Sequence, residues 1–212
     1  MNSAVRVQEI LCIGLTGGIG CGKTTVAHLF QARGAFIIDT DEISHRLTQA
    51  GGEAIVQIRE MFGDDFVAAD GAMDRVRMRE LIFSDEVAKL QLERVLHPLI
   101  LTDVQQQLQQ AKRAPYVLIV VPLLLENASF LTLVRRVLVV DCTEQNQVER
   151  VMQRSSLGEA QVRAIMQRQV TRQQRLSRAD DLIYNDGEVS DLVAQVETLH
   201  QHYFSLGRQN AN

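Results

Sequence analysis

One stretch predicts the fold of this chain of 212 residues: Gly17-Gly18-Ile19-Gly20-Cys21-Gly22-Lys23-Thr24. It fits the pattern G-x-x-x-x-G-K-[ST], in which glycines let several backbone N–H groups approach phosphate oxygens closely. A short apolar run, residues 10–15, precedes it, and apolar residues follow at helical spacing over 26–30. The sequence therefore predicts a phosphate loop between a buried strand and a helix.

The residue types in this loop predict a site for a nucleoside triphosphate. Lys23 would reach the β- and γ-phosphates, and the Thr24 hydroxyl would bind Mg²⁺. The N-terminus of the following helix adds partial positive charge at the same place. A glycine-rich turn that merely joins strand to helix is the alternative, and the ordered glycines, lysine and threonines disfavour it. The dinucleotide-binding fingerprint fails, because Lys23 stands where its third glycine belongs.

Composition limits the class of protein. The chain has a formal net charge of −4, with 46% hydrophobic and 23% charged residues, as in an ordinary soluble globular protein. No apolar run approaches the roughly 18 residues of a membrane span, and the first residues lack a signal-peptide pattern. We therefore expect a single cytoplasmic α/β domain over residues 9–206, a monomer or weak homo-oligomer, with neither a membrane nor a nucleic acid as partner.

Three cysteines, Cys12, Cys21 and Cys142, lie in or beside predicted strands and have no metal-ligand spacing. We expect them to be reduced packing residues, without a zinc site or a disulfide framework. Cys21 also lies inside the phosphate loop, and nothing in the sequence indicates whether its thiol is sensitive to oxidation.

Two carboxylates follow the next predicted strand. Residues 34–41 combine a glycine, a short apolar run and then Asp39 and Asp41. In a doubly wound sheet, ligands gather at the carboxyl ends of the strands, so both acids are expected on the rim that carries the phosphate loop. A carboxylate there can accept the proton of an attacking hydroxyl or hold Mg²⁺ through water. Capping of the next helix is the alternative; we favour function for Asp41 and leave Asp39 open.

A mainly helical segment, residues 42–114, separates two predicted core strands. Apolar residues recur at three- and four-residue spacing over 43–47, 54–62, 76–83, 87–101 and 104–111. Ser84, followed by two acids, fits a helix cap. The segment is too long for a plain crossover, so we expect it to form the acceptor side of the cleft. His97, in its middle, is a candidate substrate contact, with a structural role as the alternative.

Three further strands are predicted over residues 116–121, 134–140 and 179–184. Many phosphate-loop enzymes carry a metal-holding aspartate near the end of the first of these strands. Val120 and Val121 occupy those positions here, which strengthens the case for Asp39 and Asp41. Asp141 follows the second strand.

The chain is expected to end in a turn and an amphipathic helix, roughly residues 189–206. The turn, Asn185-Asp186-Gly187, is well placed to cover an adenine edge. Asn, Asp and Gly are also common turn-forming residues, so a turn without any function is equally consistent with this sequence.

An arginine-rich segment, residues 150–178, reverses the acidic character of the chain. It contains seven arginines and no lysine, and Glu159 is its only acid. The guanidinium group of arginine forms paired hydrogen bonds with phosphate oxygens and stabilises the charge that spreads over a phosphoryl group during transfer. A solvated basic face is the alternative, and we expect it for most of the seven. Arg150 and Arg154, one turn apart on one helix face, are the favoured catalytic pair.

Five stretches together resemble the dephospho-coenzyme A kinases, from about residue 13 to the last helix. They are Gly14-Leu15-Thr16-Gly17-Gly18-Ile19-Gly20-Cys21-Gly22-Lys23-Thr24-Thr25-Val26-Ala27, Asp39-Thr40-Asp41, His97-Pro98-Leu99-Ile100, Pro122-Leu123-Leu124-Leu125-Glu126, and Ala179-Asp180-Asp181 through Asn185-Asp186-Gly187. Cys21 and Thr24 stand where serines are usual, and Leu125 where phenylalanine is commoner. Valines replace the aspartate before Pro122, so we assign no metal role there.

The resemblance implies an activity and a fold. The activity is ATP-dependent phosphorylation of the ribose 3′-hydroxyl of dephospho-coenzyme A, the last step of coenzyme A synthesis, with Mg²⁺ as cofactor. The fold is that of a P-loop kinase, α/β with a five-stranded parallel sheet. Residues 42–114 would form a helical acceptor-binding region, and residues 150–178 a lid.

The resemblance also assigns roles to residues. The catalytic residues would be Lys23, Asp41, Arg150 and Arg154, with Asp41 accepting the hydroxyl proton. ATP would contact Gly18, Ile19, Gly20, Cys21, Gly22, Lys23, Thr24, Thr25, Asn185 and Gly187. The acceptor would contact Thr16, Asp39, Asp41, His97 and Leu123. The metal would be bound by Thr24 and Asp39.

Three alternatives for function differ in what they demand of the sequence. Another small-molecule kinase, such as one acting on a nucleoside monophosphate, shares the core and lid and differs only in the acceptor region. A GTP-driven switch protein needs D-x-x-G and N-K-x-D, and neither occurs here. A nucleotide-binding protein without catalysis is disfavoured by Asp41 and the arginine-rich segment.

Overall fold

The five predicted strands form one sheet in the computed structural model, which describes residues 10–155 and 157–210. They are β1 (Cys12–Gly17), β2 (Phe36–Asp39), β3 (Val117–Val120), β4 (Arg136–Asp141) and β5 (Asp181–Tyr184). Their order in the sheet is β2-β3-β1-β4-β5, and β1 lies parallel to both β3 and β4. The expected α/β class with a five-stranded parallel sheet is confirmed.

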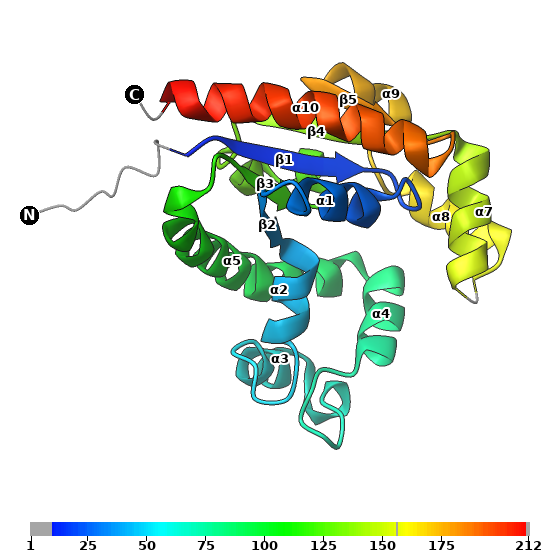
Figure 1. The fold of residues 1–212 in the computed structure, drawn as a ribbon. Coiled ribbons are helices and arrows are strands. Elements are labelled where there is room, and N and C mark those ends of the chain that lie inside the picture. Colours follow the sequence, from blue (N-terminus) through cyan, green and yellow to red (C-terminus); the bar gives the residue numbers. More distant parts are fainter. Residues whose placement is uncertain (1–9, 156, 211–212) are drawn as a thin grey trace, which may run out of the picture. The chain divides into compact units, whose positions relative to one another are not determined.

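The chain divides into two compact units, residues 1–38 with 110–212, and residues 39–109. The helices of the first unit are α1 (Lys23–Gln31), α6 (Ala128–Leu131), α7 (Glu144–Arg154), α8 (Glu159–Gln167), α9 (Arg172–Ser177) and α10 (Val189–Asn210), with short 3₁₀ turns η3 (Ala111–Arg113) and η4 (Leu124–Glu126). Within this unit, α10 runs alongside the sheet, and α7 and α8 lie next to each other beyond the carboxyl end of β1 (Figure 1). Residue 9, where the expected domain begins, lies outside the described residues.

The core of the first unit joins the sheet to α1 and α10. Its central strands bury nearly every side chain, as expected for parallel strands covered on both faces. Phe30 of α1 stacks on Tyr203 of α10 at 6.0 Å between ring centroids. The Tyr203 hydroxyl donates to Asp181, whose carboxylate also pairs with Arg136 at 2.8 Å. This network fixes β4, β5 and α10 together and so sets the positions of the strand ends.

The second unit is helical. It contains α2 (Thr40–Leu47), α3 (Ile55–Phe62), the 3₁₀ turn η2 (Asp64–Phe66), α4 (Arg75–Ser84) and α5 (Glu86–Gln110). The helices predicted over 87–101 and 104–111 are one continuous helix, α5, which accommodates Pro98. The expected cap at Ser84 is wrong, because Ser84 ends α4 and its hydroxyl donates back to Glu80 and Leu81 carbonyls. Asp85 is the cap, accepting from the Val87 and Ala88 amides.

Within the described part of the chain, none of the helices combines the length and the apolar character needed to cross a membrane.

Candidate functional site

The phosphate loop joins β1 to α1, and its backbone forms a narrow cradle. Gly20 and Gly22 have φ angles of +77° and +91°, a region that favours glycine. A Cβ atom at Gly20 would lie 2.7 Å from the Gln147 carbonyl oxygen, and one at Gly22 would collide with the side-chain amide of Asn185. Both positions therefore require glycine, and a cradle free of side chains fits the phosphates of a nucleotide.

Lys23, the first residue of α1, lies over the loop. Its Nζ donates to the carbonyl oxygens of Gly17 at 2.9 Å and Gly18 at 3.2 Å. The ammonium group is thus already held beside the cradle, and phosphate oxygens are stronger partners for it than neutral carbonyls.

Thr24 is exposed in the first turn of α1. Among residues 10–155 and 157–210, no three His, Cys, Asp or Glu side chains lie close enough together to hold a metal ion. Mg²⁺ commonly keeps several waters and binds one or two protein oxygens together with substrate phosphates. The Thr24 hydroxyl, beside the phosphate loop, fits a site at which Mg²⁺ would be bound jointly by the protein, water and substrate phosphates.

The end of β4 and the start of α7 lie directly beneath the loop. Cys142, which follows β4, has its sulfur 3.4 Å from that of Cys21. Gln147 is completely buried; its Nε2 donates to the Cys142 carbonyl at 3.3 Å. The Gln147 Oε1 is buried without a hydrogen-bond partner in the described structure and lies 2.5 Å from the place of a Cβ at Gly18. Gln147 is not marked in the sequence, because a glutamine one turn into a helix carries no distinctive signal.

The predicted closing turn contacts the loop from β5. Asn185 is 8% exposed, and its Nδ2 donates to the Cys21 carbonyl at 2.8 Å. Asp186 accepts from the Thr143 amide, the Thr143 hydroxyl and Asn146 Nδ2. Desolvation opposes ionisation of Asp186, but these hydrogen bonds outweigh it and hold the pKa of its carboxyl below the ordinary value. The turn therefore ties the loop to the start of α7.

A hollow of about 330 Å³ adjoins the loop, lined by α8, α9, the segment between them and Glu144 at the start of α7. Its lining contains Arg163, Arg172, Arg175 and a single acid. Gln169, from the same lining, accepts a hydrogen bond from the Ile19 amide at 3.2 Å through Oε1. A hollow with three arginines next to a loop amide suits a polyanion such as a polyphosphate.

Two of these arginines are firmly held. Arg172 forms a bidentate pair with Asp141 at the end of β4, with Nη2 2.6 Å from Oδ2 and Nε 2.9 Å from Oδ1. This hydrogen bonding raises the pKa of Arg172 above its ordinary value. Arg175 is 7% exposed; Nη1 donates to the Val170 carbonyl, and Nη2 lies beside Gly18. Asp141 is therefore occupied by an arginine, whereas Arg175 is directed at the loop.

The favoured arginines Arg150 and Arg154 do not line this hollow. Arg150 is half-buried on α7, and its Nη1 is buried without a hydrogen-bond partner among the described residues. Arg154 is the exposed last residue of α7. Arg163, Arg172 and Arg175 belong to the same arginine-rich segment, but their spacing does not mark them, because they lie on two different helices that only folding brings together.

In the second unit, Asp39 caps α2. Its Oδ1 accepts from the Asp41 amide at 2.8 Å and the Glu42 amide at 3.4 Å, so the capping alternative describes what this oxygen does here. Asp41 is exposed in the first turn of α2, and His97 is half-buried in α5. The roles assigned to these three residues stay predictions.

The other two expected acceptor contacts belong to the first unit. Thr16 is 2% exposed, and its hydroxyl donates to the Pro122 carbonyl at 3.2 Å, which joins β1 to the segment after β3. Leu123, in that segment, is 40% exposed. Glu126, three residues further on, accepts from the Val170 amide at 3.0 Å and so contacts the arginine-rich segment. Exposure makes Leu123 the better candidate for a substrate contact.

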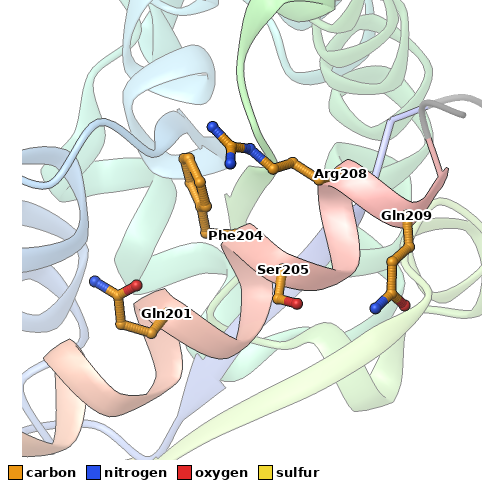
Figure 2. Close-up of a pocket in the computed structure, with 5 residues that line it drawn as sticks. All are labelled: Gln201, Phe204, Ser205, Arg208 and Gln209. Carbon is orange, nitrogen blue, oxygen red and sulfur yellow. The ribbon is translucent and has the colours of Figure 1, made fainter.

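A second hollow lies along α10 and is lined by Gln201, Phe204, Ser205, Arg208 and Gln209. Figure 2 shows these five side chains, with the guanidinium of Arg208 lying 4.4 Å from the centre of the Phe204 ring. All five belong to one helix, and none is a carboxylate or a histidine that could accept a proton from the Ser205 hydroxyl or from an attacking substrate hydroxyl. This hollow therefore lacks a general base for phosphoryl transfer.

Comparison with known proteins identifies the family. The family model described as "Dephospho-CoA kinase" matches residues 11–191. The chain is 52% identical to the dephospho-CoA kinase of Burkholderia lata (93% of this chain, 98% of the relative) and 48% identical to that of Nitrosospira multiformis (94% and 99%). The structure of the Campylobacter jejuni dephospho-CoA kinase has the same fold, with a TM-score of 0.68 and 24% identity over 92% of this chain and 97% of that one. With the loop, the parallel sheet and this match in agreement, the chain belongs to the dephospho-CoA kinase family.

Proposed function

We propose that this chain transfers the γ-phosphoryl group of ATP to the ribose 3′-hydroxyl of dephospho-coenzyme A, giving coenzyme A and ADP. The observation that carries the proposal is the glycine cradle with Lys23 laid across it, in a chain matched by the family model over residues 11–191. The cradle supports the triphosphate half of the reaction. Family membership supports the acceptor.

The first unit would bind ATP. Loop amides from Gly18 to Thr25 would surround the phosphates, and Lys23 would exchange its two carbonyl partners for phosphate oxygens. Arg175, directed at the loop, and the arginine-lined hollow would add positive charge as it accumulates on the migrating group. We keep Asn185 and Gly187 as candidates for the adenine edge, noting that the Asn185 amide already holds the Cys21 carbonyl.

The second unit would supply the acceptor side. Asp41, exposed at the start of α2, would accept the proton of the 3′-hydroxyl as it attacks. Asp39 would position that turn through its cap, with Thr16, His97 and Leu123 as further acceptor contacts. We propose residues 42–114 as the acceptor-binding region and residues 150–178 as the lid, with Arg150 and Arg154 as its catalytic arginines.

We further propose Mg²⁺ as cofactor. When bound, it would neutralise charge on the β- and γ-phosphates. Thr24 would hold it through its exposed hydroxyl, and Asp39 is the second candidate, through water. We also propose a cytoplasmic location and a monomer or weak homo-oligomer.

An acceptor panel tests the proposed function. The pure protein is incubated with Mg·ATP and, separately, with dephospho-coenzyme A, AMP or shikimate, and phosphorylated product is measured. We expect turnover with dephospho-coenzyme A to exceed that with either other acceptor by at least about 100-fold. The contacts that lower the free energy of the transition state form fully only with the correct acceptor. Preferred phosphorylation of AMP would instead establish a nucleoside monophosphate kinase, and ATP binding without any transfer would establish a non-catalytic binding protein.

A further inference from the structure

Cys21 and Cys142 form a pair of thiols beneath the phosphate loop. Their Sγ atoms lie 3.4 Å apart, and both residues are fully buried. Cys21 belongs to the loop itself, whereas Cys142 directly follows β4. The transfer proposed above uses the backbone of the loop and neither thiol.

The two thiols have different environments. The hydrogen bond from Cys142, together with the charges of Lys23 and Arg175, outweighs burial and lowers the pKa of Cys21 to about 7. The same hydrogen bond and burial raise the pKa of Cys142 above its ordinary value. A thiolate beside a protonated thiol is the arrangement in which one cysteine attacks an oxidant and the other resolves the product.

Cys12 provides a contrast within the same unit. It is buried in β1, and burial raises the pKa of its thiol to about 11. A thiol of that kind is a poor nucleophile near neutral pH. Cys12 therefore serves as the control for the pair.

We propose that Cys21 and Cys142 are a modification site at which a hydroperoxide, with hydrogen peroxide as the simplest member, forms a disulfide that switches off the phosphate loop. The thiols are buried, so a small oxidant suits the site better than a bulky one. The loss of activity rests on the proposed function, whereas formation of the disulfide does not.

The chemistry balances with hydrogen peroxide as the only co-reactant. The Cys21 thiolate attacks one peroxide oxygen, the O–O bond breaks, and the departing hydroxide takes a proton to become water. The Cys142 sulfur then attacks the Cys21 sulfenic acid, losing its own proton as the S–S bond forms and the S–O bond breaks. A second water leaves, so the two thiols are oxidised by two electrons while the peroxide is reduced to two waters.

The new bond would displace the loop. A disulfide has about 2.05 Å between its sulfurs, so atoms now 3.4 Å apart have to approach by roughly 1.4 Å. Cys142 is fixed by β4 and by Gln147, so the displacement falls on Cys21 and its bond to Asn185. Because Gly20 is already packed against Gln147, the loop has little room to compensate. A misplacement of about 1 Å in a site that positions reactants costs on the order of 100-fold in rate.

The test uses the full chain and three proteins: wild type, Cys142→Ala, and Cys12→Ala as matched control. Each is treated with hydrogen peroxide, free thiols are blocked, and a digest without reductant is analysed by mass spectrometry. We expect a peptide pair joined through Cys21 and Cys142 in wild type and Cys12→Ala. We also expect at least a tenfold loss of kinase activity in both, restored by dithiothreitol. Cys142→Ala should form no crosslink, and the dithiothreitol-reversible loss should be absent from it.

Two results would overturn the proposal. One is the absence of the Cys21–Cys142 crosslink while other residues of wild type become oxidised. The other is a loss of activity in Cys142→Ala as large and as reversible as in wild type. If Cys142→Ala fails to fold, Cys142→Ser takes its place. The crosslink is read without any activity assay, so failure of the proposed function and failure of the switch are distinguishable.

Discussion

At the scale of single residues, Gly22 is the position on which the cradle most depends. It combines a φ of +91° with an absence of space, because any Cβ meets the Asn185 amide. Gly34 has nearly the same φ, +92°, but nothing lies within 4 Å of a Cβ built there. A side chain at Gly34 would therefore introduce backbone strain alone, whereas one at Gly22 would introduce both strain and a steric clash.

This contrast predicts different outcomes for the same substitution. Gly34→Ala should lower the free energy of unfolding by about 1 kcal/mol through strain alone and leave ATP affinity unchanged. Gly22→Ala should carry that strain and also displace Asn185, weakening ATP binding by at least about tenfold. Denaturant unfolding and calorimetric titration with ATP measure the two effects. Equal ATP affinity in both variants would mean that the cradle does not bind the phosphates.

Asp41 is the residue assigned to the acceptor. Asp41→Asn should cut turnover by about 10²–10⁴-fold while leaving ATP affinity nearly unchanged, because the carboxylate acts on the acceptor hydroxyl. Glu42→Gln, which neutralises the next exposed acid of the same turn, is the matched control and should keep full turnover. Steady-state kinetics with ATP titration make the comparison. A selective loss of ATP binding in Asp41→Asn would contradict the assignment.

At the scale of elements, the turn between β5 and α10 is joined to the start of α7 through Asp186. Because the pKa of this carboxyl is depressed in the folded chain, its stabilising effect is complete above the ordinary value of 3.8. That effect is lost as pH falls through the lower folded pKa. Arg172, which also faces Asp186, favours the charged form.

Asp186→Asn removes this ionisation and yields a pH-dependent prediction. Wild type should be more stable than the variant at neutral pH, and the difference should shrink below pH 3.8 as the wild-type carboxyl gains its proton. Denaturant unfolding at a series of pH values measures it. A difference that grew on acidification would contradict the hydrogen-bonding pattern given for Asp186.

The elements themselves were largely predictable from the sequence. Each strand was expected within a few residues of its bounds, because buried parallel strands are continuous apolar runs. The apolar segments 87–101 and 104–111 belong to one helix, because a helix can continue where its apolar spacing lapses if tertiary packing supports it. The cap at Ser84 was wrong because Ser84 and Asp85 both suit a cap, and only the backbone path decides between them.

The site was less predictable than the fold. The phosphate loop follows from local spacing, since its glycines, lysine and threonine are consecutive. Arg172, Arg175 and Gln147 meet the loop or the end of β4 only through folding, so no pattern along the chain marks them. The contact between Cys21 and Cys142, 121 positions apart, has the same origin.

At the scale of the whole molecule, the chain comprises two units with different expected tasks, ATP in the first and the acceptor in the second. The boundary of the second unit, residues 39–109, lies close to the helical segment 42–114 that the sequence suggested. The assignment of acceptor binding to that unit remains a prediction. Its test requires the full chain, because the proposed roles of Lys23 and Asp41 fall in different units.

The most direct test follows the phosphate itself. Wild type and Lys23→Ala are incubated with Mg·ATP and dephospho-coenzyme A, and the position of the new phosphate is determined by phosphorus and proton NMR. We predict a monoester on the ribose 3′-oxygen for wild type. We predict a rate lower by about 10²–10³-fold for Lys23→Ala, folded as judged by circular dichroism, because an electrostatic stabiliser has been removed. Phosphate at another position, or near-normal turnover in Lys23→Ala, would contradict the account.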